Sequence, residues 1–240
     1  MRIALFKPRW RFPVSQGDPT TNRRWPPLEL LNCAAILRSH GHEVRLVDAQ
    51  AERLSPRAAA RRAGGCDLAL LSTSPLDRWQ CPPLDLGPVE ALAAALRDEV
   101  PCLAVTGFHG TAFPELVLDR LGADVVLRGE PEASVAALAG GTPWEEIAGL
   151  AFRREGVVVQ TPEPSPVELN RLLPPAFDLI ELGRYDYELL GPRLAVLETA
   201  RGCSGGCGFC SRLMFGGGVR RKTLEQIREE IDRAVASGAR

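Results

Sequence analysis

Lysine is almost missing from this chain of 240 residues, because it occurs only at positions 7 and 222. Arginine supplies nearly all of the 29 basic residues, and 30 acidic residues leave a net charge of −1. The sequence has no basic block with interleaved aromatic side chains, which is the usual footprint of a protein that binds nucleic acid. We therefore expect no nucleic-acid partner and attribute the arginine to a compositional bias of the genome.

Long apolar runs are lacking as well. No stretch reaches the roughly 18 apolar residues of a membrane-spanning helix, and the first run, in MRIALFKPRW, is too short for a signal peptide. We therefore expect a cytoplasmic protein without a membrane partner. In that compartment the seven cysteines are expected as thiols or metal ligands rather than disulfides. Four of them are expected to be small buried side chains: Cys33, Cys66, Cys81 and Cys102.

The first 140 residues alternate short apolar runs with amphipathic stretches. Strands are predicted at 2–6, 43–49, 67–74, 102–107 and 124–129, and helices at 26–41, 55–64, 87–100, 113–122 and 131–140. Nearly all-apolar strands that alternate with helices indicate a parallel sheet covered on both faces. Residues 1–140 are therefore predicted to form a flavodoxin-like, doubly wound α/β domain with the strand order 2-1-3-4-5.

A connecting region is predicted at 141–190. It begins with a hairpin at 148–162, which turns at 154–156. The stretch 163–180 is rich in proline and has no clean period, so it is predicted to be an extended linker.

The last part, 191–240, contains an apolar strand at 193–200, a cysteine-rich loop and a helix at 223–238. Thr223 and Gln226 are predicted to form a capping box at the start of this helix. One apolar face consists of Leu224, Ile227, Ile231 and Val235. One strand and one helix cannot bury a core of their own, so we interpret this part as the first βα unit of a larger barrel, incomplete here.

Three cysteines lie close together in ETARGCSGGCGFCSRL (198–213): Cys203, Cys207 and Cys210. Structural zinc needs four protein ligands, and no other Cys or His follows position 109. A disulfide would leave one thiol over, and catalytic zinc with three ligands usually includes His. A 4Fe–4S cluster fits better, because three irons take thiolates and the fourth stays open for a small molecule. The neighbouring glycines allow the backbone to wrap closely around it.

The spacing C-x-x-x-C-x-x-C, with Phe209 before the last Cys, resembles the radical S-adenosylmethionine (SAM) superfamily. RWPPLELLNCAAILRSHGHEVRLVDA, GFHGTAFPELVLDRLGADVVLRGEPE and LPPAFDLIELGRYDY look like its cobalamin-binding subgroup, and the resemblance runs from about residue 2 to 237. It implies that Cys203, Cys207 and Cys210 ligate a 4Fe–4S cluster and that Phe209 lies against the SAM adenine. It also implies that the flavodoxin-like domain binds cobalamin.

The corrin ring of cobalamin is expected beyond the carboxyl ends of the parallel strands. The loops at 7–13, 72–78, 107–112 and 128–131 lie at that edge. The candidate cobalamin contacts are Ser72, Thr73, Gly107, His109, Thr111, Gly129 and Glu130. Alternatively, Ser72 and Thr73 cap strand ends, His109 is a solvated loop histidine, and Glu130 caps the following helix.

Two features depart from the family pattern. The first loop, KPRWRFPVSQGD (7–18), has no Asp-x-His-x-x-Gly motif, whose His ligates cobalt from below, so no lower histidine ligand is expected. The Gly-Gly-Glu strand that holds the SAM amino group is absent from the 240 residues, and FGGGVRR (215–221) is expected to be a flexible turn. The chain alone is therefore expected to be an inactive fragment, unless another polypeptide completes it.

For function, the resemblance implies a radical SAM enzyme that transfers a methyl group to a substrate carbon through a 5′-deoxyadenosyl radical. The implied partners are a small-molecule or natural-product substrate and an electron donor such as flavodoxin or ferredoxin. Three alternatives stay open: a cyclase-type enzyme that does not methylate, a corrinoid-binding module without catalysis, and a structural zinc protein completed by a partner's ligand.

Overall fold

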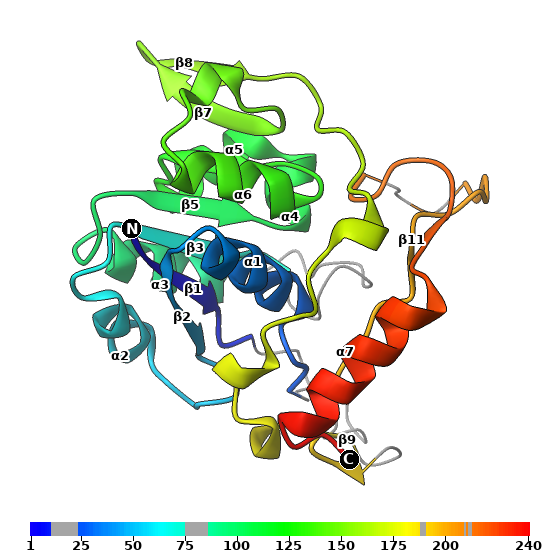
Figure 1. Ribbon diagram of the computed structural model, residues 1–240. Helices are drawn as coiled ribbons and strands as arrows, with labels where there is room; N and C mark the ends of the chain where they lie inside the picture. The colour runs from blue at the N-terminus through cyan, green and yellow to red at the C-terminus, as the bar shows by residue number, and fades with distance from the viewer. Residues whose placement is uncertain (11–23, 75–85, 188–190, 209, 211–212) are drawn as a thin grey trace.

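The computed structural model describes residues 1–10, 24–74, 86–187, 191–208, 210 and 213–240, and it has a mixed α/β fold (Figure 1). Seven strands of the described chain form one sheet in the order β2-β1-β3-β5-β6-β7-β8. Their bounds are β1 Arg2–Lys7, β2 Glu43–Asp48, β3 Leu68–Ser72, β5 Leu103–Thr106, β6 Val125–Leu127, β7 Leu150–Arg154 and β8 Val157–Gln160. The five strands from β2 to β6 are parallel neighbours, in the order predicted.

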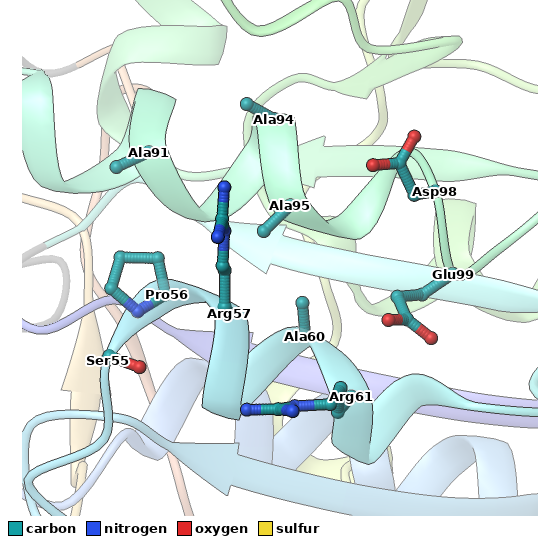
Figure 2. A pocket seen from close by; sticks show the side chains of 10 residues that line it. All are labelled: Ser55, Pro56, Arg57, Ala60, Arg61, Ala91, Ala94, Ala95, Asp98 and Glu99. Atoms are coloured by element: carbon teal, nitrogen blue, oxygen red, sulfur yellow. The ribbon is translucent and has the colours of Figure 1, made fainter.

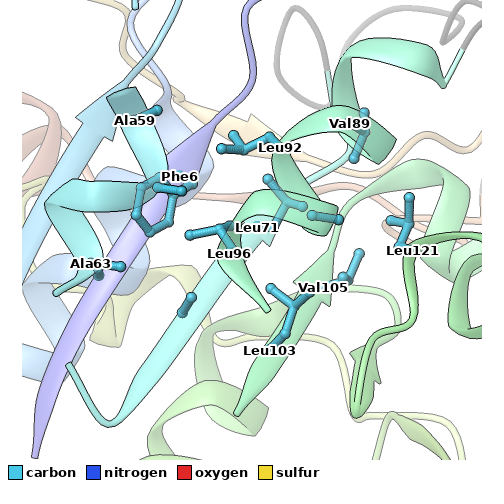
Figure 3. Close-up of a cluster of buried hydrophobic side chains, with 14 of the residues drawn as sticks. Phe6, Ala59, Ala63, Leu71, Val89, Leu92, Leu96, Leu103, Val105 and Leu121 are labelled. Atoms are coloured by element: carbon cyan, nitrogen blue, oxygen red, sulfur yellow. The ribbon is translucent and has the colours of Figure 1, made fainter. Parts of the chain in front are cut away.

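Helices cover both faces of the sheet. Successive side chains of each strand point to opposite faces and are buried on both. In β1, Ile3 and Leu5 join one hydrophobic cluster and Phe6 joins another. The first cluster lies under α1 (Leu28–Ser39) and α6 (Pro131–Ala139). The second, drawn in Figure 3, lies under α2 (Pro56–Ala60), α3 (Gly87–Leu96) and α5 (Pro114–Leu121). Each large side chain buried in this way contributes about 1.5–3 kcal/mol.

The helix start predicted at Ser55 is confirmed. Its Oγ accepts a hydrogen bond from the Ala58 amide at 3.2 Å, and Pro56 occupies the first turn of α2. This short helix continues into a 3₁₀ turn at Arg61–Ala63.

Two elements of the sheet and its covering helices differ from the sequence prediction. The predicted hairpin is present as β7 and β8, but it extends the sheet, because β7 pairs antiparallel with β6. The sheet therefore continues beyond residue 140. The loop predicted at 107–112 contains a short helix, α4 (Phe108–Ala112), which begins directly after Gly107.

The linker and the segment after it contain little regular structure. The described linker has 3₁₀ turns at Leu169–Arg171, Phe177–Leu179 and Leu182–Arg184. Short strands follow, β9 Asp186–Tyr187 paired with β10 Gly191–Pro192, and β11 Ala200–Arg201 paired with β12 Arg220–Arg221. The strand predicted at 193–200 is wrong, since within the described chain only its last residue, Ala200, belongs to a strand pair. The turn predicted at 215–221 contains β12 at its end.

The last helix, α7 (Leu224–Ala236), lies beside the sheet layer together with β11 (Figure 1). The Thr223 hydroxyl accepts from the Gln226 amide at 3.3 Å, as predicted. The Gln226 side chain donates to the Leu169 carbonyl instead of completing the capping box. Leu224, Ile231 and Val235 on the predicted apolar face are 79%, 43% and 59% exposed. Glu230 and Ala234 are buried instead.

No helix among the described residues is both long and apolar enough to cross a membrane.

Candidate functional site

The residues predicted at the carboxyl edge of the sheet do come together. Ser72 and Thr73 follow β3, and the Thr73 hydroxyl donates to the Thr106 carbonyl at the end of β5 (2.9 Å). The Ser74 amide donates to the Ser72 hydroxyl at 3.1 Å. Both hydroxyls thus serve the strand ends, which is the alternative that the sequence left open for them.

Gly107 and His109 pack against Thr73 and Ser74, which follow β3 at this edge. Gly107 has φ +105°, and a Cβ on it would lie 2.7 Å from the Ser74 hydroxyl and 2.8 Å from the Thr73 hydroxyl. The position therefore requires glycine. The buried His109 ring places Nδ1 3.0 Å from the Thr73 carbonyl. Because a carbonyl only accepts, Nδ1 carries the proton in this contact.

Thr111 joins the loops after β5 and β6. Its hydroxyl donates to the Gly107 carbonyl at 3.0 Å and accepts from the Gly129 amide at 2.9 Å. Gly129 has φ +68°, and a Cβ there would approach Pro164 of the linker to 3.1 Å and the Met214 carbonyl to 4.0 Å. Gly129 at the edge of the sheet therefore faces both the linker and the segment after the cysteines.

Trp10 was missed by the sequence analysis, although it belongs to the first loop at this edge. Its ring stacks on His109 with 6.5 Å between ring centroids, and Phe108 meets the same imidazole edge-on at 6.4 Å. Trp10 is buried, and its indole nitrogen has no hydrogen-bond partner among the described residues. His109 is thus packed between aromatic rings and is not a solvated loop histidine.

A second buried group at this edge consists of Lys7, Asp48 and Tyr185. The Lys7 ammonium lies 3.4 Å from Asp48 Oδ2, and both side chains are 2% exposed. The Tyr185 hydroxyl, from the linker, donates to the same oxygen at 3.0 Å. Burial raises the pKa of Tyr185, and the negative charge of Asp48 raises it further. Lys7 and Asp48 are ordinary surface residue types, so only the edge position at the ends of β1 and β2 could have singled them out.

Glu130 lies in an ion network rather than at an open edge. One of its carboxylate oxygens accepts from Arg201 at 2.7 Å and from Arg220 at 3.0 Å. Arg201 also contacts Glu132 and Glu198, each at 2.6 Å. Glu130 makes no side-chain cap on α6. Whether it also contacts cobalamin stays a prediction.

A further ion pair lies beside this network, between Lys222 and Glu230 of α7 (2.5 Å). Burial raises the pKa of Glu230, against the opposing effects of its hydrogen bond to Lys222 and the charge of that lysine. The two groups together contain four acidic and three basic side chains that are largely removed from water: Glu130, Glu132, Glu198, Glu230, Arg201, Arg220 and Lys222.

The cysteine loop is closed at its base and open at its tip. Cys203 forms a β-bridge with Gly217, next to the β11–β12 pair. Cys203, Cys207 and Cys210 are all exposed. A Cβ on Gly205 would lie 3.3 Å from the Cys203 sulfur and 3.7 Å from the Cys207 sulfur, so these two sulfurs flank one glycine. The Gly205 amide donates to the Cys203 sulfur at 3.2 Å.

The third cysteine is less closely placed. The Cys210 amide donates to the Cys207 carbonyl at 3.1 Å. Within the described part of the chain, no three His, Cys, Asp or Glu side chains are gathered closely enough to hold a metal ion. Phe209 lies outside the described residues. The donor set nevertheless fits an iron–sulfur cluster, since it offers three soft, solvent-facing thiols on a glycine-rich loop.

The isolated cysteines have a different environment. Cys33 and Cys66 are buried in the two hydrophobic clusters, as predicted. Cys102 is half-buried, and burial, with a smaller effect of Asp124, raises the pKa of its thiol to about 11. Cys81 lies outside the described residues. The described thiols are therefore divided into buried or half-buried ones in the sheet layer and exposed ones in the loop.

An open groove of about 840 Å³ lies between α2 and α3 (Figure 2). Alanines make up much of its lining, together with Arg57 of α2, Arg61 of the following 3₁₀ turn, and Asp98 and Glu99 after α3. None of the candidate residues at the sheet edge or in the cysteine loop borders it. We therefore place the candidate site at the carboxyl edge and the cysteine loop.

No family model matches the chain. Single proteins do. An uncharacterized methyltransferase of Pyrococcus horikoshii is 29% identical over 96% of this chain and 50% of its own length. An anaerobic magnesium-protoporphyrin IX monomethyl ester cyclase of Synechocystis is 27% identical over 96% of this chain and 46% of its own. The hopanoid C-3 methylase of Methylococcus capsulatus is 31% identical over 90% of this chain and 41% of its own length. The chain thus spans about half the length of these relatives.

Two solved structures share the fold over 99% of this chain. One is the cobalamin-dependent SAM radical enzyme OxsB with aqua-cobalamin and SAM bound, with a TM-score of 0.75, 18% identity and 32% of that chain covered. The other is the radical SAM methyltransferase TsrM of Kitasatospora setae with cobalamin and a 4Fe–4S cluster bound, with a TM-score of 0.70, 18% identity and 46% covered. At this identity the match concerns the fold.

Proposed function

Because the chain belongs to the cobalamin-binding radical SAM enzymes, we propose that it carries the cobalamin site and the cluster loop of such an enzyme. The activity that we propose for the whole enzyme is methyl transfer to a carbon of a small-molecule substrate. One observation carries the proposal: the three-cysteine loop is joined by buried ion pairs to the sheet edge where the candidate cobalamin residues lie.

The chain divides at the boundaries predicted from the sequence, except that the hairpin joins the first unit. Residues 1–140 and the hairpin up to Gln160 form a flavodoxin-like, cobalamin-binding unit. The linker follows, and 191–240 is the start of a radical SAM barrel. The strand order from β2 to β6 supports the first assignment, and the cysteine spacing supports the second.

In the cluster loop, Cys203, Cys207 and Cys210 would be the iron ligands, and Phe209 would lie against SAM. When bound, the cluster would supply the electron that cleaves SAM, and cobalamin would supply the methyl group. The chain's own contribution is the loop geometry. Gly205 brings two sulfurs together, and its amide donates to one of them, which stabilises negative charge on that sulfur.

At the sheet edge, cobalamin would lie against the loops after β3, β5 and β6, where Gly107 packs closely on the β3 end and Gly129 on the linker, and both glycines are retained as candidate contacts. Ser72, Thr73, His109, Thr111 and Glu130 are retained as candidate contacts. The first loop has no His, so the proposed complex has no histidine below cobalt from that loop.

A second candidate function is a cyclase-type reaction without methyl transfer. The similarity to the magnesium-protoporphyrin IX monomethyl ester cyclase of Synechocystis favours it. Both functions use the same cofactor sites, so a test of those sites applies to either.

The test is anaerobic reconstitution of the full chain with iron, sulfide and hydroxocobalamin. We expect the absorption of a 4Fe–4S cluster and about one bound cobalamin per chain. Replacing Cys203, Cys207 or Cys210 with Ala should abolish the cluster and leave cobalamin binding intact. The control is Cys102→Ala, which removes a half-buried thiol of the sheet layer and should change neither. A cluster that survives any of the three loop variants would refute the assignment.

A further inference from the structure

Arg201 connects two parts of the structure from a position without solvent contact. It ends β11, two residues before Cys203, and its side chain is 0% exposed. Its guanidinium contacts Glu198 through Nε, Glu130 through Nη1 and Glu132 through Nη2, at 2.6, 2.7 and 2.6 Å. Glu130 and Glu132 stand at the start of α6, directly after the sheet edge. The cysteine segment and the cobalamin edge are thus joined through one side chain.

The contact uses the geometry of arginine and not only its charge. Each of the three carboxylates receives a hydrogen bond from a different nitrogen of the rigid, planar guanidinium. Lysine would present all its donors on one nitrogen and could not span the three carboxylates in this way. Because the acids are buried, an unpaired carboxylate here would be strongly unfavourable.

Arg201 also holds the far side of the cysteine loop. Its Cζ atom lies 5.9 Å from the centre of the Phe215 ring, which follows the cysteines in the chain. Arg220, on β12, donates to Glu130 and to the carbonyls of Phe215 and Val167. Both ends of the loop therefore meet Glu130 at the start of α6, through Arg201 and Arg220.

We propose that Arg201 is a positioning residue that fixes the base of the cysteine loop to the cobalamin edge of the sheet. It acts through Glu130 and Glu132 and does not itself touch a reacting atom. That the two sites hold a cluster and cobalamin rests on the proposed function. The clamp itself is a property of the chain without either cofactor.

The first experiment is amide hydrogen exchange on the full chain without cofactors. The reporter is the Lys222 amide, which donates to the Thr199 carbonyl across the base of the loop at 3.0 Å. We expect its protection to fall about tenfold in Arg201→Lys and about a hundredfold in Arg201→Met, while amides in β1, β3 and β5 change less than about twofold. Arg233→Met is the matched control, because Arg233 is exposed and its ion pair with Glu229 lies at the surface.

The second experiment measures position with a spectroscopic signal. The chain is reconstituted with cluster and cobalamin and reduced, and the microwave power saturation of the cob(II)alamin EPR signal is recorded. This signal relaxes faster when a reduced cluster is held nearby. We expect Arg201→Lys to give slower or heterogeneous relaxation at unchanged iron and cobalt content, and Arg233→Met to match the unsubstituted chain.

The outcomes separate the two proposals. Equal Lys222 exchange in Arg201→Lys, Arg201→Met and Arg233→Met would overturn the clamp, as would a rise that extends over β1, β3 and β5. Unchanged relaxation in Arg201→Lys would overturn the positioning role. If the unsubstituted chain binds neither cofactor, the proposed function fails, whereas the exchange comparison still decides whether Arg201 fixes the loop.

Discussion

Tyr185→Phe removes a single hydroxyl from the contact between the linker and the sheet edge. That hydroxyl donates to Asp48 Oδ2 at 3.0 Å, and Tyr185 is only 1% exposed. A hydrogen bond to a charged group is worth about 1.5–3 kcal/mol. Since Lys7 remains beside the same oxygen, we expect the lower part of that range, about 1.5–2 kcal/mol of lost stability. For a chain of this size, that corresponds to a fall in Tm of roughly 3–8 °C.

The assay is urea unfolding of the full chain, followed by tryptophan fluorescence and by circular dichroism. Asp48→Asn and the double variant complete a double-mutant cycle, which isolates the interaction between the two side chains. We expect a coupling energy of about 1 kcal/mol or more. A loss below about 0.5 kcal/mol in Tyr185→Phe, or an equal loss in the Asp48→Asn background, would refute the reasoning.

Three further predictions concern the thiols, the loop base and cobalt. The pKa of Cys102 is raised from 9.0 to about 11, so iodoacetamide at pH 8 should label Cys203, Cys207 and Cys210 far faster than Cys102, and equal rates would contradict this. Because the unfolded thiol releases its proton first, this group should lower folding stability as pH rises from about 9 to about 11. Gly202 has φ +86° and no room for a Cβ beside the Gly218 carbonyl, so Gly202→Ala should cut iron loading. Gly206→Ala should not, because no atom of the described residues lies within 4 Å of a Cβ there. Bound cob(II)alamin should show no nitrogen triplet in its EPR spectrum, and a triplet lost in His109→Ala would show that this prediction is wrong.

The parallel sheet could be predicted because its strands are short, almost wholly apolar runs, as in β3, where every residue is buried. The addition of β7 to the sheet could not, because a hairpin sequence does not state which edge it joins. The apolar run at 193–200 was wrongly predicted as a strand. The apolar side chains of this run are buried by packing instead, since Val196 is buried and has no strand partner among the described residues.

The cysteines could be found from their spacing, but the residues that place them could not. Arg201, Glu132 and Glu198 are charged, and charged residues in a sequence usually indicate a solvated surface. Only the fold brings them together, across about 70 positions of sequence between Glu132 and Arg201. Glu130 was selected for its place at the sheet edge, and the structure gives its carboxylate two arginine partners.

The most direct test of the central claim is elemental analysis of the anaerobically reconstituted full chain, with zinc present as a competitor during loading. The account predicts about four iron and four sulfide per chain together with about one cobalt, because three thiolates and an open iron define the cluster site. One zinc per chain without acid-labile sulfide would contradict it.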